Sequence, residues 1–205
     1  MTSGHSIQFF DAQFERQAIA GDLALNSFEL AALPYLRGRV LDFGCGMGNL
    51  AVAAAKRGCS VVALDGSGIA IRHLQQRARQ EALDITAAQA DLRNHDIDAD
   101  FDTVVSIGLL MFFNCASAFN RLANLQAHVR EGGVAIINVM IEGTTYRDMF
   151  DPIDHCLFKR SEMARRFDGW TILHSEFSNF AKPENRVKSF VTLIARKPLA
   201  PAADA

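Results

Sequence analysis

The fold is decided by the stretch Val40-Leu41-Asp42-Phe43-Gly44-Cys45-Gly46-Met47-Gly48-Asn49-Leu50-Ala51. It begins with a short apolar run that contains one acid, passes through three glycines at alternate positions, and ends in an alanine-rich segment. This order predicts a strand, a tight turn and a helix. Glycine tolerates a positive φ and leaves its backbone bare, and the first N–H groups of a helix are free. The stretch therefore predicts a pocket for a nucleotide-like ligand.

The spacing of the glycines separates two classes of ligand. A dinucleotide-binding turn reads G-x-G-x-x-G, which would place its third glycine where this chain has Asn49 rather than at Gly48. Asp42 precedes Gly44 by two residues, and a carboxylate there repels a pyrophosphate and favours a ligand with a positive end. An NAD(P)-dependent oxidoreductase is thus the disfavoured alternative. A glycine-rich turn without any ligand is the other alternative.

Acids also follow the next two predicted strands. Residues 59–64 are a continuous apolar run that ends at Asp65, and the weaker strand at residues 84–89 is followed by Asp91. An acid at the end of the second strand is placed to accept hydrogen bonds from ribose hydroxyls. Asp91 alone would be interpreted as a solvated turn residue. As the third acid in the series after Asp42 and Asp65, it is predicted to contact the same ligand.

The motif D-x-G-x-G-x-G after a strand resembles motif I of the class I S-adenosylmethionine-dependent methyltransferases, whose ligand carries an ammonium and a sulfonium group. Over residues 40–197 the chain is similar to the tellurite-resistance branch of these enzymes. The stretches that carry this resemblance are residues 41–49, 101–113, 158–170 and 192–197.

The resemblance implies methyl transfer to soft anionic or thiol-like acceptors, including tellurium and selenium oxyanions. It also implies that Asp91 takes the adenine amino group, with the Leu92 backbone beside it. That branch tends to carry a His-Arg pair before its last strand. This chain instead has Ser-Asn-Phe-Ala-Lys at residues 178–182, and its nearest guanidinium is that of Arg186.

The predicted cofactor is S-adenosyl-L-methionine, with S-adenosyl-L-homocysteine as product. The predicted cofactor-binding residues come from the glycine turn and the ends of the following strands: Asp42, Gly44, Cys45, Gly46, Gly48, Asn49, Asp65, Gly66, Ser67, Ala90, Asp91, Leu92, Ser106, Ile107, Gly108 and Met111. No metal site is predicted. The cysteines lack zinc spacing, and the alternating acids at residues 96–100 lack the glycine and glutamate of a calcium loop.

Alternating strand and helix patterns predict a doubly wound α/β fold, a seven-stranded Rossmann-like methyltransferase sheet in a single domain of residues 1–197. The strands are expected at residues 40–43, 59–64, 84–89, 101–107 and 134–141, followed by an antiparallel C-terminal hairpin at residues 170–180 and 187–196. Helices are expected at residues 49–57, after Ser67, at residues 117–130 and after Ser161. Ser67 and Ser161 are expected to act as N-caps. Residues 198–205 are predicted to be a disordered tail.

The first 38 residues are predicted to form one or two helices. Phe9, Phe10 and Phe14 begin an irregular apolar series that is broken at Gly21 and stopped at Pro34. These aromatic side chains could simply pack on the sheet. The family resemblance implies instead an N-terminal helical lid that closes over the cofactor and excludes water.

Composition narrows the function further. The chain has 205 residues, 49% of them apolar, and a formal net charge of −2, which gives no basic footprint for nucleic acid. Residues 1–20 lack the apolar region of a secretion signal, and the longest apolar run, residues 104–113, is too short to span a bilayer. We expect Cys45, Cys59, Cys115 and Cys156 to be reduced, buried thiols of a cytoplasmic protein. The expected partner is a small-molecule substrate, and the chain is expected to act as a monomer or homodimer.

Methyl transfer by in-line displacement mainly requires that the two reactants are aligned and that water is excluded. A soft nucleophile that is ionised at neutral pH needs no base. If a base is needed, His155 and His174 are the catalytic candidates by pKa. Tyr146 and Arg147 could orient an anionic substrate. The alternatives are that these are structural residues, and that the chain is a cofactor-binding regulatory protein without catalytic activity.

Overall fold

The computed structural model describes residues 4–21 and 23–200, so residues 201–205 of the predicted tail lie outside the described part. One seven-stranded sheet has the order β3-β2-β1-β4-β5-β7-β6. Its strands are β1 (Arg39–Phe43), β2 (Ser60–Asp65), β3 (Ile85–Gln89), β4 (Phe101–Ile107), β5 (Val129–Met140), β6 (Thr171–Lys182) and β7 (Arg186–Arg196). The first five are parallel, and β7 runs antiparallel to both β5 and β6. The predicted fold class, including the C-terminal hairpin, is confirmed.

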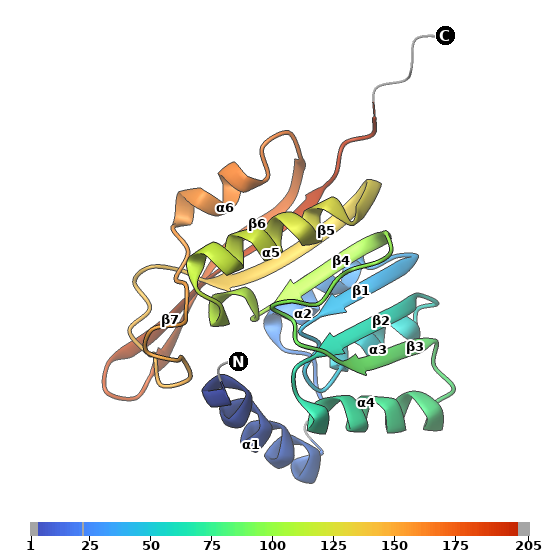
Figure 1. Ribbon diagram of the computed structural model, residues 1–205, viewed down its shortest axis with the longest axis horizontal. Coiled ribbons are helices and arrows are strands. Elements are labelled where there is room, and N and C mark those ends of the chain that lie inside the picture. Colours follow the sequence, from blue (N-terminus) through green and yellow to red (C-terminus); the bar gives the residue numbers. More distant parts are fainter. Residues whose placement is uncertain (1–3, 22, 201–205) are drawn as a thin grey trace.

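Helices cover both faces of this sheet (Figure 1). They are α1 (Gly4–Ala20), α2 (Ser27–Ala32), α3 (Asn49–Ala55), α4 (Gly68–Gln80), α5 (Cys115–Ala127) and α6 (Arg160–Arg166), with short 3-10 turns η1 (Leu33–Tyr35) and η2 (Leu110–Phe112). Apolar residues of α5 and α6 pack in one core cluster, and those of α2, α3 and α4 pack in the other. In Figure 1, α1 lies beside α4, on the side to which the parallel strands point.

Burial on both faces explains why the central strands read as continuous apolar runs. Along β1, Leu41 and Phe43 belong to the cluster with α5, whereas Val40 belongs to the cluster with α3. In β5, Ile137 and Val139 face the first cluster and Ile136 faces the second. Among the described residues, no helix is long and apolar enough to cross a membrane.

Two predicted helix starts are wrong by two residues each. Helix α5 begins at Cys115, because the side chain of Asn114 accepts a hydrogen bond from the Ser117 N–H at 3.0 Å and is the N-cap. This helix ends at Ala127, before the predicted end at residue 130, and the chain continues directly into β5. Helix α6 has Lys159 rather than Ser161 at its N-cap, without a capping side-chain bond. By contrast, Ser67 caps α4 as predicted, accepting from the Ala70 N–H at 3.1 Å.

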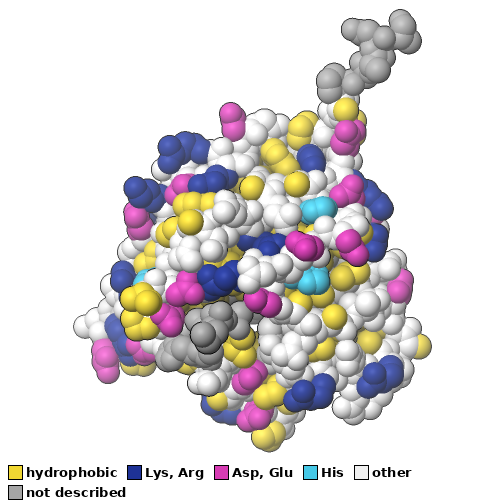
Figure 2. Space-filling view, in the orientation of Figure 1, with side chains coloured by type: hydrophobic (Ala, Val, Ile, Leu, Met, Phe, Trp, Pro, Cys, Tyr) yellow, Lys and Arg dark blue, Asp and Glu magenta, His cyan; other side chains and the backbone are white. Residues whose placement is uncertain are grey.

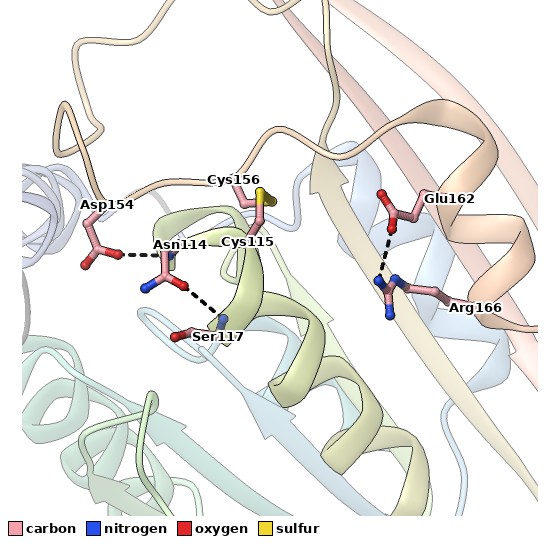
Figure 3. The surroundings of a disulfide bond; sticks show 7 residues. All are labelled: Asn114, Cys115, Ser117, Asp154, Cys156, Glu162 and Arg166. Carbon is pink, nitrogen blue, oxygen red and sulfur yellow. Dashed lines mark hydrogen bonds and ion pairs between the residues drawn. A yellow bond between two sulfur atoms is a disulfide. The ribbon is translucent and has the colours of Figure 1, made fainter.

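The prediction of four reduced thiols is wrong for two of them. Cys115 and Cys156 form a disulfide with a Cα–Cα distance of 4.8 Å, across 41 residues of sequence. Figure 3 shows the bond joining the first turn of α5 to the loop that follows β5. In the same place, the Asn114 N–H donates to the Asp154 carboxylate at 2.9 Å. Cys45 and Cys59 are free and buried, as expected.

Charged side chains of both signs are interspersed over the face of the molecule shown in Figure 2. Several acids and bases pair there and elsewhere on the surface, as in the Arg130–Asp102 and Arg166–Glu162 ion pairs, at 3.0 Å and 2.9 Å. Ion pairs that are in contact with solvent, as these partly exposed pairs are, contribute little to stability.

Candidate functional site

A cavity of about 1160 Å³ opens at the carboxyl ends of the parallel strands. It lies where the strand order reverses, between β1 and β4, which is the usual ligand position in open α/β sheets. Residues of α1 and α2 also line it, so the N-terminal helices form part of its wall. The cavity is large enough for a nucleoside ligand together with a small second molecule.

All but two of the predicted cofactor-binding residues line this cavity. They are Asp42, Gly44, Cys45, Gly46, Asn49, Asp65, Gly66, Ser67, Ala90, Asp91, Leu92, Ile107, Gly108 and Met111. Of the two exceptions, Ser106 is buried within β4. Gly48 is the N-cap of α3 with φ 73°, and a Cβ there would lie 2.5 Å from Leu74 Cδ1. Gly48 therefore shapes the turn that Gly44 and Gly46 present to the cavity.

Asp42 is a buried acid with an oxygen that no described residue contacts by a hydrogen bond. The residue is 4% exposed, and the oxygen without a partner is Oδ2. Burial raises the pKa of Asp42 to about 8, and the neighbouring carboxylates of Glu29 and Asp65 add to this shift. An unpaired buried acid is costly unless a cation or a donor meets it. The site is therefore suited to a ligand with a positive group.

Asp65 links the two turns that border the cavity. One carboxylate oxygen accepts from the Gly46 N–H at 2.8 Å, and the other accepts from the Ser67 N–H at 2.8 Å. Burial raises the pKa of Asp65, while these backbone bonds act in the opposite direction. The Gly66 backbone acts on this carboxylate as well. A carboxylate has about four acceptor positions, so at least one remains for a ligand. Asp65 thus has a structural role in addition to its predicted contact with ribose.

Asp91 combines the two interpretations that its sequence position allowed. Its carboxylate accepts from the Arg93 N–H at 3.2 Å and from Asn94 Nδ2 at 2.9 Å, so it does organise a turn. Asp91 also lines the cavity beside buried Leu92.

Glu29 is a cavity residue that the sequence did not predict. It is the third residue of the capping box of α2: the Asn26 N–H donates to its Oε2 at 2.8 Å, and its own N–H donates to Asn26 Oδ1 at 3.0 Å. Burial raises the pKa of Glu29. Its approach to Asp42 completes a group of three carboxylates, Glu29, Asp42 and Asp65, which we call the carboxylate cluster. The Asn-x-x-Glu spacing signalled the cap but not the position over the cavity.

The N-terminal aromatic residues close the cavity on one side. Phe10 lies 5.2 Å from Phe112 and 5.9 Å from Phe14, measured between ring centres. The Phe14 ring lies so close to the glycine turn that a Cβ on Gly46 would be 3.3 Å from it. The Ser67 hydroxyl also donates to the carboxylate of Asp11. Helix α1 is thereby tied to the loop that follows β2.

The opposite end of the cavity lies against the β6–β7 hairpin. We call this the hairpin end; its residues are Asn138, Met140, Tyr146, Lys182, Lys188 and Phe190. Of these, only Tyr146 was a predicted substrate residue. Arg147, the predicted companion of Tyr146, is not among the lining residues, and its Nε donates to the Thr144 carbonyl at 3.5 Å. Arg186 is paired with Asp148 at 2.7 Å and lies over the Tyr146 ring.

The two predicted catalytic histidines do not line the cavity in the described part of the chain. His155 stacks on Phe150 with ring centres 5.0 Å apart, and its Nδ1 lies 2.9 Å from the Asp151 carbonyl oxygen. His174 lies on β6, with its Nε2 3.4 Å from Glu176. Neither is brought to the acids at the strand ends.

Solved structures share this fold. TehB from Haemophilus influenzae has a TM-score of 0.72 and 23% sequence identity, covering 85% of this chain and 63% of that one. A Burkholderia thailandensis 1,6-didemethyltoxoflavin-N1-methyltransferase, solved with 1,6-didemethyltoxoflavin and S-adenosylhomocysteine bound, has a TM-score of 0.68 and 18% identity, covering 96% and 88%. The fold is therefore the Rossmann-like fold of the S-adenosylmethionine-dependent methyltransferases.

Sequence comparison assigns the chain to a narrower group of proteins than the fold does. Residues 6–193 match the family described as tellurite resistance protein TehB, and the chain belongs to that family. A curated relative, the probable S-adenosyl-L-methionine-dependent methyltransferase TehB of Haemophilus influenzae (strain 10810), is 26% identical over 196 residues and covers 92% of this chain. The chain spans 66% of the length of that relative.

Proposed function

We propose that this protein is an S-adenosylmethionine-dependent methyltransferase that acts on a small soft or anionic acceptor. The observation that carries the proposal is the buried Asp42 carboxylate, which has an oxygen without a partner in a cavity beside Glu29 and Asp65. A pyrophosphate cofactor would bring more negative charge to these acids, whereas an ammonium or sulfonium group would neutralise them.

The residues present fit this cofactor in three zones. Asp42 and the glycine turn face the zone for the amino-acid group, Asp65 keeps acceptor capacity for ribose hydroxyls, and Asp91 with Leu92 faces the zone for adenine. When bound, the cofactor supplies an electrophilic methyl group on a positively charged sulfur. Relatives support the assignment, because the Haemophilus TehB protein is named a probable S-adenosyl-L-methionine-dependent methyltransferase.

The protein itself aligns the two reactants and excludes water, and it is not assigned any acid–base role. Phe10, Phe14 and Phe112 border the cavity with apolar surface that excludes water. Because neither predicted histidine lines the cavity, the proposal assigns no general base. It favours an acceptor whose nucleophile is already reactive at neutral pH. We include helix α1 in the proposal as a lid, since it contributes to the wall and contacts the glycine turn.

Calorimetric titration with S-adenosylhomocysteine and, separately, with NAD and NADP tests the cofactor. We expect binding of the first alone, and a loss of roughly 1.5 to 3 kcal/mol in Asp42→Asn, since a bond to a charged group is lost. Asp84→Asn, which changes an exposed acid just before β3, is the matched control and should bind normally. Binding of a dinucleotide instead would refute the proposal.

A second assay separates an enzyme from a regulatory protein. Purified protein is incubated with methyl-labelled S-adenosylmethionine and a panel of thiols, metalloid oxyanions and small amines. Transfer of label that is lost in Asp42→Asn and retained in Asp84→Asn supports catalysis. Tight cofactor binding with no transfer to any member of the panel would favour a cofactor-binding regulatory protein.

A further inference from the structure

The hairpin end of the cavity carries positive charge that the described residues do not neutralise. Lys182 and Lys188 both line it, and neither is in an ion pair within the described part of the chain. Lys188 Nζ lies 3.5 Å from Met149 Sδ and 4.7 Å from the centre of the Tyr146 ring. Asp148, which acts electrostatically on Lys188, is already paired with Arg186 at 2.7 Å. Two ammonium groups therefore line this end of the cavity without an ion-pair partner among the described residues.

Burial makes this arrangement unfavourable without a ligand. Partial burial lowers the pKa of Lys188, and the charge of Lys182 lowers it further. An anion placed between the two side chains would reverse both effects, because it favours the charged form of each. This end of the cavity is thus suited to a carboxylate or a group of similar charge.

A second polar group lies closer to the glycine turn. Asn138 is 0% exposed, and its Nδ2 donates to Thr192 Oγ1 at 2.9 Å. Its Oδ1 has no hydrogen-bond partner among the residues that the structure describes. Asn138 pairs with Ile107 at the end of β4, and both line the cavity. A buried amide oxygen without a partner is costly and favours a hydrogen-bond donor beside it. An N–H or O–H group on the acceptor would supply this donor.

The register of the sheet sets the spacing of these groups. Asn138 pairs with Thr192 and Met140 pairs with Phe190, so Asn138, Met140, Phe190 and Lys188 follow one another on one face of the sheet. Thr192 and Lys188 are four residues apart on β7, which is roughly 13 Å along a strand. A single-centre oxyanion is too small to reach from Asn138 to Lys188, even when the lysine stem leans toward the asparagine.

The surface between the two polar groups is apolar and aromatic. Met140 and Phe190 form the floor, and the Phe28 ring of α2 lies 4.9 Å from that of Phe190. Such walls favour a flat, apolar molecular body. A metalloid oxyanion has no surface that would use them.

We propose that the methyl acceptor is an aromatic amine that carries a carboxylate. This rests on the proposed function. The amine N–H donates to Asn138 Oδ1, the ring lies against Met140, Phe28 and Phe190, and the carboxylate meets Lys182 and Lys188. The amine nitrogen forms the new bond to the methyl carbon, while the bond from that carbon to sulfur breaks and its electron pair stays on sulfur. The resulting ammonium releases its proton to water, so no base is required.

Calorimetry on protein saturated with S-adenosylhomocysteine tests this inference. The probes are the ortho, meta and para isomers of aminobenzoate and aminophenylacetate, their uncharged amides, toluate, selenite and tellurite. We expect at least one aminobenzoate or aminophenylacetate to bind tenfold or more tightly than its amide. The same compound should bind more tightly than toluate, which lacks the amine. Lys188→Met should remove the preference for the carboxylate, whereas Lys159→Met, an exposed lysine outside the cavity, should not.

The outcomes distinguish failure of the acceptor assignment from failure of the proposed function. If S-adenosylhomocysteine binds but every aromatic acid binds no better than its amide, the acceptor assignment is wrong and the proposed function stands. Tighter binding of selenite or tellurite than of all aromatic acids would also overturn the assignment. If S-adenosylhomocysteine itself does not bind, the proposed function and the acceptor assignment both fail. The inference is confirmed if an aminobenzoate or aminophenylacetate binds, and if the Lys159→Met variant transfers label to its nitrogen whereas the Lys188→Met variant does not.

Discussion

Without a cationic ligand, Asp42 is mostly protonated at pH 7, because its pKa is raised to about 8. An ammonium group of the cofactor would lower this pKa, so binding should release about one proton per site at pH 7. Cofactor affinity should accordingly rise as the pH increases from about 4 to about 8, the window between the ordinary and the raised pKa of Asp42.

Titrations in two buffers of different ionisation enthalpy measure the released proton. Asp42→Asn should release fewer protons, since the titrating carboxyl of Asp42 is removed while those of Asp65 and Glu29 remain. A proton count near zero in the unmodified protein would contradict the assignment of Asp42 to the positive end of the ligand.

The cost in stability of replacing Gly48 has two contributions, one from the backbone conformation and one from side-chain contact, and a comparison with Gly58 separates them. Both have a positive φ, of 73° and 86°, but a Cβ would lie 2.5 Å from Leu74 at Gly48 and meets nothing within 4 Å at Gly58. Gly58→Ala should cost about 1 kcal/mol through its backbone alone. Gly48→Ala should cost about 1 to 3 kcal/mol more, because buried Leu74 must move. Denaturant unfolding measures both, and equal losses would show that the contact with Leu74 is unimportant.

At the scale of elements, the disulfide fixes the loop after β5 to the first turn of α5. Closing a loop of 41 residues is expected to stabilise the fold by about 4 kcal/mol through the chain entropy of the unfolded state. Unfolding of the protein in denaturant with and without a phosphine reductant measures this contribution. The Cys115→Ser/Cys156→Ser double variant is the control and should not respond to the reductant. An unchanged unfolding midpoint on reduction would contradict the prediction.

The disulfide also removes one reason for the predicted cytoplasmic location, which relied on reduced thiols. Its partners are far apart in sequence, and no local pattern couples them. Pairing became visible only when the fold brought α5 and the loop together.

A further prediction at this scale concerns helix α1. It contacts the glycine turn through Phe14 and the loop after β2 through Asp11. If α1 is a lid, S-adenosylhomocysteine should slow hydrogen exchange of its backbone amides by tenfold or more, because the ligand adds contacts that hold it. Amides of α6, on the other face of the sheet, are the internal control. Equal exchange in α1 with and without ligand would make it a static wall.

At the scale of the whole molecule, the sequence predicted the sheet and the cavity residues at the strand ends better than the residues of the hairpin end. Parallel strands are continuous apolar runs and ligands bind at their carboxyl ends, so Asp42, Asp65 and Asp91, which line the cavity, could be predicted from local patterns. Glu29, Asn138 and Lys188 reach the cavity only through packing of α2 and the pairing of β5 with β7. Asn138 left a weak signal, as a lone amide in an apolar strand. His155 and His174 were chosen by residue type alone, without a pattern to place them.

The central claim is that acids at three consecutive strand ends hold one sulfonium cofactor. A crystal structure of the protein with S-adenosylhomocysteine tests it most directly. We predict the ligand's amino group nearest Asp42, its ribose hydroxyls within hydrogen-bond distance of Asp65, and its adenine beside Asp91 and Leu92. A ligand bound elsewhere, or in the reverse orientation with adenine at Asp42, would contradict the account.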